Sequence, residues 1–459
     1  MLHDSAKPFH DYVDAEAGTV DRIIFSDQAI YEMELERIFA RAWNFMCHES
    51  QIPNKGDYFL TFIGEESVIA TRDKTGTLQV FINSCRHRGN AVCRAESGNA
   101  RSFLCTYHGW TFGLDGKLIG VPGYKDLYHE DLKREEWGLI SAGKVQSYNG
   151  FVFATMDPEA PDLYDYLGDV GRIGLNLCAA RGEVVVIDGI QKNQIGCNWK
   201  LAVDNVFDYY HGAISHASSF MSGYSPTSGL QRSNTNKDGA PLPPPTVSDP
   251  YTHRVVLSEY GHAISGPRIT AEMRRSMQEG ENPDPIMVHE GWRDTPVARE
   301  MLGEVGSDVR GHPNIFPNLW VSTGGTQLSL RLPKGPTTTE IWWFTFLDKN
   351  LSSEERTTRM QRANHVFGPA GLLEQDDGEN WDQSTRAMAG LVARRYPLNF
   401  SMSQGHGTVI SPKSGPRYID THINEHAQLW TYRAWAEWMD ADSWASLKQH
   451  RTSMPADVV

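Results

Sequence analysis

Several features that would place this chain in other protein classes are missing from its sequence. No apolar run reaches the roughly eighteen residues that a membrane helix needs, and the acidic residues 1–16 lack the apolar core of a secretory signal. No cluster of Lys and Arg occurs, and the net charge is -14, which argues against a nucleic-acid partner because phosphates require a basic surface. The chain also shows no internal repeat. We therefore expect a soluble, cytoplasmic protein.

Cysteine is scarce as well. Four of the six cysteines, Cys47, Cys93, Cys178 and Cys197, are scattered without a disulfide-like pattern, which fits a reducing compartment. With 459 residues the chain is long enough for two or three domains. Its 40% hydrophobic and 22% charged residues are ordinary for a globular protein.

The two remaining cysteines belong to a pair of short motifs, Cys85-Arg86-His87 and Cys105-Thr106-Tyr107-His108. Two thiolates and two imidazoles form the ligand set of a Rieske [2Fe-2S] centre, in which neutral imidazoles raise the reduction potential to roughly -150 to +300 mV, against about -400 mV for an all-cysteine ferredoxin. A structural zinc site is the alternative, but zinc motifs usually place two to four residues between the first two ligands, and here one residue separates Cys85 from His87. The motifs favour a cluster that accepts electrons.

Around these ligands the runs Cys85–Gly89 and Cys105–Trp110 resemble the Rieske signature of bacterial aromatic-ring-hydroxylating oxygenases. This signal alone indicates electron transfer, and a simple electron carrier would share it.

The hydrophobic pattern predicts two domains. A helix is expected over residues 27–42, with Ser26 or Asp27 as its N-cap. Residues 43–156 show short alternating runs broken by turns, which indicates a small antiparallel β domain, the Rieske domain, with both ligand loops at one end. Residues 1–42 and 157–459 would form the catalytic domain, a larger mixed domain with an antiparallel sheet covered by helices, so the predicted fold class is α+β.

Within the larger domain, strands are expected at residues 183–188 and 339–347. Residues 221–252 are rich in Ser, Gly, Asn and Pro, and residues 263–313 show little periodicity, so these stretches are either lid or binding loops or a disordered insertion. Five apolar side chains mark a C-terminal helix whose expected role is packing: Leu429, Trp430, Tyr432, Trp435 and Trp438.

A second metal site is suggested by His211 and His216, which could meet one ion if their helix bends or ends between them. A carboxylate would complete the two-histidine, one-carboxylate set that leaves open positions on Fe(II). The candidates are Asp376 and Asp377, in a segment with Pro369 at the expected helix start. The alternatives are a structural histidine pair and solvated aspartates, although the neighbouring apolar residues Phe367, Leu372 and Leu373 favour a buried face.

Both segments resemble the catalytic α subunit of Rieske non-haem iron ring-hydroxylating dioxygenases, the naphthalene, biphenyl and terephthalate dioxygenase group, and the resemblance covers nearly the whole chain. It implies that His211, His216 and Asp377 bind iron, with Asp376 as the substitute if the register is one residue off. It also implies that Asp208 bridges His211 to the cluster ligand His108 of a neighbouring subunit in a trimer, and that Asn205 lies near the iron. A hydrogen bond that orients His211 is a compatible role for Asp208.

The resemblance further implies cis-dihydroxylation of an aromatic ring with O₂, with a Rieske monooxygenase or O-demethylase as the alternative reaction. No Gly-x-Gly-x-x-Gly fingerprint is present, so electrons must come from a separate flavin reductase, with or without a ferredoxin. A small β subunit in an α3β3 assembly is also implied. The expected pocket walls are apolar, namely Val206, Phe207, Phe220, Phe367 and Leu373.

Two cations bear on the substrate. Arg331 and Lys334 could meet the carboxylate of an aromatic acid, although a surface position is the expected role for both. The sequence leaves hydrocarbon and aromatic acid open as substrates.

Overall fold

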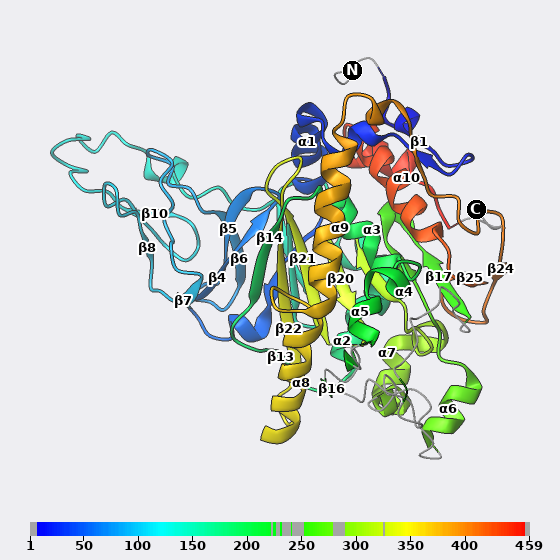
Figure 1. The fold of residues 1–459 in the computed structure, drawn as a ribbon. Helices are drawn as coiled ribbons and strands as arrows, with labels where there is room; N and C mark the ends of the chain where they lie inside the picture. Colours follow the sequence, from blue (N-terminus) through cyan, green and yellow to red (C-terminus); the bar gives the residue numbers. More distant parts are fainter. Residues whose placement is uncertain are drawn as a thin grey trace. The chain divides into compact units, whose positions relative to one another are not determined.

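The structure is a computed structural model, and it describes residues 7–221, 224–225, 230–231, 240, 252–278, 290–324 and 326–454. The chain folds into two compact units (Figure 1). We call Ile38–Asp165 the small unit, and Met1–Arg37 together with Tyr166–Val459 the large unit.

The small unit is built from short antiparallel strands in three sheets, with the strand orders β6-β5-β4-β7, β11-β12-β3 and β10-β9-β8. Its strands are β3 (Asn44–His48), β4 (Asp57–Ile63), β5 (Glu66–Arg72), β6 (Leu78–Ile82), β7 (Ser97–Asn99), β8 (Phe103–Leu104), β9 (Thr111–Phe112), β10 (Leu118–Gly120), β11 (Lys144–Tyr148) and β12 (Phe151–Thr155). The prediction of a small antiparallel β domain is therefore confirmed.

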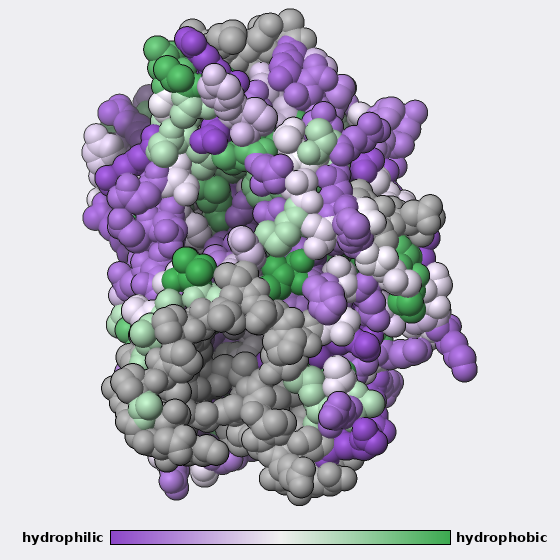
Figure 2. Space-filling view, turned by 45° about the vertical axis from the view of Figure 1, so that its right-hand side comes forward, coloured by the Kyte–Doolittle hydropathy of each residue, from purple (hydrophilic) through white to green (hydrophobic). Residues whose placement is uncertain are grey.

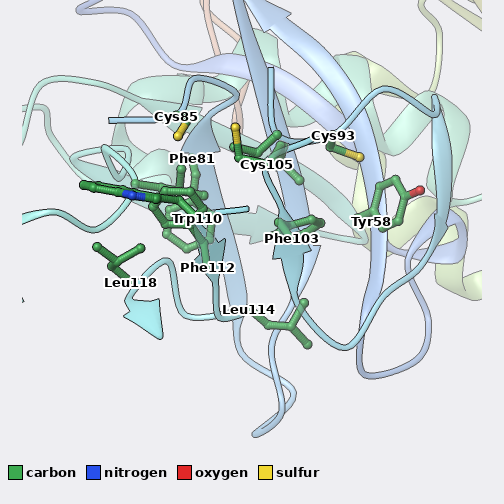
Figure 3. Packing of buried hydrophobic residues seen from close by; sticks show 13 residues of the cluster. Tyr58, Phe81, Cys85, Cys93, Phe103, Cys105, Trp110, Phe112, Leu114 and Leu118 are labelled. Atoms are coloured by element: carbon green, nitrogen blue, oxygen red, sulfur yellow. The ribbon is translucent and has the colours of Figure 1, made fainter. Parts of the chain in front are cut away.

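Both Cys/His motifs lie beside the core of the small unit. Cys85 follows β6, and Cys105 to His108 connect β8 to β9. Figure 3 shows the sulfur atoms of Cys85 and Cys105 on the same side of this core, close to Trp110, whereas the sulfur of Cys93 lies toward Tyr58. The β strands thus bring two motifs that are separate in sequence to one place.

The large unit contains a ten-stranded antiparallel sheet among its described residues, with the order β13-β22-β21-β20-β19-β18-β17-β25-β24 and with β14 also paired to β22. Its strands are β13 (Val184–Val186), β14 (Gln191–Ile195), β17 (His253–Leu257), β18 (Ala263–Ser265), β19 (His312–Ile315), β20 (Leu319–Ser322), β21 (Gln327–Pro333), β22 (Thr339–Asp348), β24 (Thr408–Ile410) and β25 (Tyr418–Thr421). Shorter pairings join β1 (Val13–Asp14), β2 (Thr19–Val20) and β23 (Leu398–Asn399), and also β15 (Tyr224–Ser225) and β16 (Leu230–Gln231).

Helices cover this sheet, as predicted. They are α1 (Gln28–Glu34), α2 (Leu163–Ala179, which begins in the small unit), α3 (Trp199–Asp204), α4 (Gly212–Ser215), α5 (Ala217–Met221), α6 (Ala271–Gln278), α7 (Pro296–Gly306), α8 (Ser353–Val366), α9 (Leu372–Met388), α10 (His426–Asp440) and α11 (Trp444–His450). Figure 1 shows α8 and α9 running along one side of the sheet, so the fold class α+β is confirmed.

The predicted ends of these elements agree with the structure in part. Asp27 caps α1 by accepting hydrogen bonds from the backbone N–H groups of Ala29 and Ile30, at 2.9 and 3.0 Å. The five apolar residues predicted for the C-terminal helix are buried in α10. Residues 263–313 contain β18, α6, α7 and β19, so the prediction of an irregular stretch is wrong for these elements. Residues 221–252 lie almost entirely outside the described residues.

The helix that carries the two aspartates starts later than predicted. Its N-cap is Gly371, and Pro369 precedes it, so the prediction that Pro369 opens the helix is wrong. Of the three apolar neighbours invoked for a buried face, Leu372 is exposed, whereas Asp377 is buried. A strongly polar helix such as α9 gives little periodicity from which its first turn could be located.

None of the helices in the described part of the chain has the length and apolar character needed to cross a membrane. The coloured part of the face in Figure 2 is mostly hydrophilic, and its apolar residues form small separate groups. Small apolar groups of this kind are normal on a protein surface.

A buried ionic network joins α1, α3 and α10 of the large unit. Glu34 is fully buried, and its carboxylate accepts hydrogen bonds from Lys200 Nζ at 2.5 Å, Trp435 Nε1 at 2.7 Å and Trp199 Nε1 at 2.8 Å. Burial lowers the pKa of Lys200, and the carboxylate of Glu34 opposes this shift. The network fixes α3, the helix from which the chain leads to Asp208 and His211.

Replacing Glu34 by Ala leaves a buried ammonium group without its carboxylate. We expect the variant to lose about 3–5 kcal/mol of the free energy of unfolding of the large unit, because removing one partner of a buried ion pair exposes the full desolvation cost of the other. Urea denaturation followed by tryptophan fluorescence measures the loss. The control is the double variant Glu34→Leu, Lys200→Met, which removes both charges and should be more stable than Glu34→Ala. An equal loss in both variants would contradict this account.

Candidate metal centres

The two Cys/His motifs of the small unit form matching turns. In each, the glycine four residues after the cysteine donates its N–H to the cysteine carbonyl, at 2.8 Å for Gly89 and 2.9 Å for Gly109. Both glycines have a positive φ, 74° and 77°, a conformation that L side chains rarely adopt. The rings of His87 and His108 lie 4.5 Å apart between centroids. The turns thus present two thiols and two imidazoles together.

The surroundings of these side chains shift their pKa values, and the two thiols shift in opposite directions. Burial raises the pKa of Cys105, but the backbone N–H groups of Tyr107 and His108 and the amide of Asn90 outweigh it, so the pKa lies below its ordinary value. Burial and the neighbouring His108 lower the pKa of His87, which keeps its ring neutral. The buried Nδ1 of His87 has no hydrogen-bond partner among the described residues. Burial raises the pKa of the other thiol, Cys85. Two thiols, which lose their protons when they bind metal, and two imidazoles fit a [2Fe-2S] cluster with a Rieske ligand set.

The second cluster of candidate ligands begins in the segment after α3. A 3-10 turn at Asn205–Phe207 leads to Asp208, whose Oδ1 accepts hydrogen bonds from the backbone N–H groups of Tyr210 and His211, at 2.7 and 3.1 Å. His211 is the N-cap of α4 and His216 is its C-cap. The short helix therefore occupies only the residues between the two histidines and ends before His216. This is the geometry under which both imidazoles can face one ion.

Asp377 from α9 completes this cluster. His211 Nε2 lies 3.2 Å from His216 Nε2, and Asp377 Oδ1 lies 3.2 Å from His211 Nε2 and 3.4 Å from His216 Nε2. The ligand atoms of these three side chains all lie within 4.8 Å of one another, close enough for them to hold one metal ion. Two imidazoles and one carboxylate suit Fe(II), and such a set leaves coordination positions for other ligands.

The outer nitrogen of each imidazole meets a different aspartate. Asp376 Oδ2 lies 3.2 Å from His216 Nδ1, and Asp208 Oδ2 lies 3.2 Å from His211 Nδ1, an ion-pair distance without hydrogen-bond alignment. The adjacent Asp376 and Asp377 thus occupy different places: Asp377 faces the Nε2 atoms, and Asp376 faces the far side of His216. A carboxylate on Nδ1 leaves Nε2 free to bind a metal.

The cluster attracts positive charge. Burial lowers the pKa of His211, but the carboxylates of Asp208 and Asp377 more than offset this effect and raise the pKa from 6.5 to about 10. In the metal-free protein the extra proton on His211 thus balances the charge of Asp208 and Asp377. A bound metal cation would balance the charge of the same two carboxylates.

The predicted pocket residues lie on the same segments. Val206 and Phe207 are buried in the 3-10 turn, Leu373 is partly buried in α9, and the side chain of Phe220 lies outside the described residues. Phe367 stacks on Trp343 with ring centroids 4.6 Å apart, and it meets Trp320 edge-on at 5.0 Å. Contact of any of these residues with a substrate remains a prediction.

The expectation of a surface position is wrong for Arg331, whose exposed fraction is 1%. Lys334 is partly exposed, and its Nζ lies 3.9 Å from Glu340 Oε2. Glu374, which was not predicted as a site residue, is buried in α9. Burial raises its pKa to about 7, and Asp377 adds to the shift while Arg331 opposes it. The one signal that bears on Arg331 is the alternation of polar and apolar residues in β21 (Gln327–Pro333), and such a pattern normally indicates polar residues that face water.

Comparison with known proteins is consistent with both centres. Residues 176–441 match the family described as "Ring hydroxylating alpha subunit (catalytic domain)", and residues 42–145 match the Rieske [2Fe-2S] domain. The chain belongs to the ring-hydroxylating α-subunit family. It therefore carries a Rieske [2Fe-2S] cluster and the catalytic domain of a non-haem iron oxygenase.

Relatives align along almost the full length. The chain is 34% identical to the α subunit of biphenyl 2,3-dioxygenase from Rhodococcus jostii, over 97% of this chain and 94% of that protein. It is 32% identical to a benzene 1,2-dioxygenase α subunit from Pseudomonas putida, over 95% of each. A structure of naphthalene 1,2-dioxygenase with bound indole superposes with a TM-score of 0.81 at 28% identity, covering 95% of this chain and 96% of that one.

The raised pKa of His211 predicts proton release on metal binding. Because the folded pKa lies above 6.5, the protonated ring contributes stability to the metal-free protein below pH 6.5, and this contribution is lost as the pH rises toward about 10. A metal ligand must be neutral, so binding of Fe(II) near pH 8 should release about one proton per site. Anaerobic calorimetry in buffers of different ionisation enthalpy counts the protons. The variant Asp208→Asn should release fewer protons, because it removes one of the two carboxylates that raise the pKa of His211. Equal proton release in the variant and the intact protein would contradict the assignment of His211 as a metal ligand.

Proposed function

We propose that this chain is the large subunit of an oxygenase that uses O₂ to cis-dihydroxylate an aromatic ring. The observation that carries the proposal is the meeting of His211, His216 and Asp377 in a chain of the ring-hydroxylating family. The relatives named for biphenyl, benzene and naphthalene dioxygenases support the reaction class.

Each metal-facing residue has a defined task in this proposal. His211, His216 and Asp377 hold Fe(II), while Asp208 and Asp376 fix the orientation of the two imidazoles from behind. Cys85, His87, Cys105 and His108 hold the cluster. When bound, the cluster supplies electrons one at a time, and the iron supplies the reaction with O₂. The protein orients the ring and excludes water, which is the task proposed for Val206, Phe207, Phe220, Phe367 and Leu373.

Asp208 has a second task in an assembly of several chains. On the basis of the family resemblance, it is proposed to lie against the ligand His108 of a neighbouring subunit, where it would connect one chain's cluster with the next chain's iron. Its side chain is 33% exposed although it contacts His211, so one carboxylate can serve both contacts. Asn205, three residues earlier, is proposed to lie near the iron.

The remaining components are also part of the proposal. A flavin reductase, with or without a ferredoxin, would supply electrons, and a small β subunit would complete an α3β3 assembly. We assign residues 43–156 to the Rieske domain and residues 1–42 and 157–459 to the catalytic domain. None of the cysteines in the described part of the chain forms a disulfide, which supports the proposed cytoplasmic location.

Isotope labelling tests the reaction. With electron donors supplied, a panel of arenes and aromatic acids is offered under ¹⁸O₂, and the products are analysed by mass spectrometry. We expect two labelled oxygen atoms in one cis-diol, because both atoms of a single O₂ are added to the ring. A single label in a phenol or an aldehyde would identify a monooxygenase or O-demethylase instead.

Iron analysis tests the ligand assignment. The intact protein should contain about three irons per chain, two in the cluster and one at the second centre. Asp377→Ala should lower the content to about two and leave the visible spectrum of the cluster unchanged. The matched variant Asp376→Ala should still bind the third iron, with an affinity about 10- to 100-fold lower, because only an orienting contact is lost. The reverse pattern in the two variants would transfer the ligand role to Asp376.

A further inference from the structure

The large sheet carries buried polar side chains on one face, and this face holds Arg331. In antiparallel pairs, directly opposed residues share a face, and the register aligns Arg331 with Ile341, and Ser329 with both Trp343 and Trp320. The same alignment continues through β19, β18 and β14. Its buried polar side chains and indole rings include Ser265, Asn314, Trp320, Ser329, Arg331 and Trp343.

Arg331 is a buried cation with few partners. Its Nε donates a hydrogen bond to the carbonyl of Ala202 at 2.5 Å, and its Cζ lies 4.6 Å from the ring centroid of Trp320. Nη1 is buried without a hydrogen-bond partner, and Arg331 forms no ion pair with any residue in the described ranges. Burial lowers its pKa to about 10, so the guanidinium stays charged at neutral pH. Part of its planar set of N–H donors is therefore available to a bound ligand.

This cation belongs to the surroundings of the iron ligands. Asp377 and Glu374 are the carboxylates that act on it electrostatically, and both come from α9. Trp320 contacts Arg331 through its ring face and also contacts Phe367, one of the predicted pocket walls. Ala202, which accepts its hydrogen bond, lies in α3, just before the segment that carries His211 and His216.

The chemistry around Arg331 suits one ligand type. A guanidinium forms paired, charge-assisted hydrogen bonds with a carboxylate. The neighbouring Trp320 and Phe367 make the surroundings of this cation aromatic, and aromatic side chains pack well against an aromatic ring. Glu374 and Asp377 act on Arg331 electrostatically, but neither forms an ion pair with it. An incompletely paired buried charge is costly to the folded protein, and a bound anion in direct contact would reduce that cost.

We propose that Arg331 is a specificity-determining residue that receives the carboxylate of the substrate, and that the substrate is an aromatic acid and not a hydrocarbon. This inference rests on the proposed function, which it narrows. Asn314, whose buried amide has neither a donor nor an acceptor partner among the described residues, lies on the same face and provides further polar contact.

Binding without turnover tests the proposal. Equilibrium dialysis of the iron-loaded holoenzyme, without electron donors, is run with benzoate and 2-naphthoate and with their neutral amides. We expect the intact enzyme to bind at least one acid more tightly than its amide. In Arg331→Gln, the affinity for the acid should fall by about thirtyfold or more, because one partner of a buried charge pair is removed. Binding of the amide should change little.

Two further variants complete the experiment. Lys334→Gln removes a nearby cation outside the proposed site and should leave the preference for the acid unchanged. Arg331→Lys keeps the positive charge but loses the paired N–H donors of the guanidinium, so it should retain part of the preference for the acid over its amide. The absorption spectrum of the cluster verifies folding of each variant, and if Arg331→Gln does not fold, the acid-to-amide ratio of the intact enzyme and of Arg331→Lys decides.

Equal affinity for acids and amides in the intact enzyme, or an unchanged ratio in a folded Arg331→Gln, would overturn the proposal. Oxidation of benzene or biphenyl with no oxidation of any acid would also overturn it, while leaving the proposed dioxygenase function intact. If no ring compound is oxidised by the fully loaded system, the proposed function fails, and the dialysis still decides whether Arg331 recognises carboxylates.

Discussion

The packing of α9 beside the segment after α3 is the contact on which the rest of the large unit depends. It brings Asp377 to within 3.4 Å of two imidazoles that come from a distant part of the sequence. Short-range preferences cannot create such a contact. The buried Glu34 network holds α3, and α9 packs against β14 of the sheet, so each element is held in place separately. A shift of either element by 1 Å would separate the ligand atoms, which explains why the supporting groups are buried and hydrogen-bonded.

Features set by local chemistry were predictable from the sequence. The turns around Cys85 and Cys105 repeat one backbone pattern, and each needs a glycine at the same position, so the motif specifies the geometry. Asp27 caps its helix because an aspartate can accept from the next N–H groups whatever the tertiary structure is. The antiparallel strands of the small unit were also predictable, because the alternation of apolar residues and the positions of the turn residues both indicated short strands.

Features set by long-range packing were not predictable. Asp376 and Asp377 are chemically identical neighbours, and the rotation of α9 alone decides which of them faces the imidazoles. The start of α9 was misplaced at Pro369, because a polar helix with one buried stripe has a weak period. The expected surface position of Arg331 was wrong, although β21 alternates polar and apolar residues. That pattern indicates two different faces, but it does not say whether the polar face meets water or a helix.

Two buried cations of the large unit show how differently the fold treats a charge. Lys200 has a carboxylate at 2.5 Å that two indole N–H groups also stabilise, so its charge is balanced within the protein. Arg331 is equally buried, but it has one carbonyl and an aromatic ring instead. A protein can bury a full ion pair at little net cost, whereas an incompletely paired charge lowers stability. Proteins retain such a loss of stability where function requires it. Arg331 meets this condition, because it lies in the large sheet within the electrostatic influence of Asp377, the carboxylate of α9 that faces the two imidazoles.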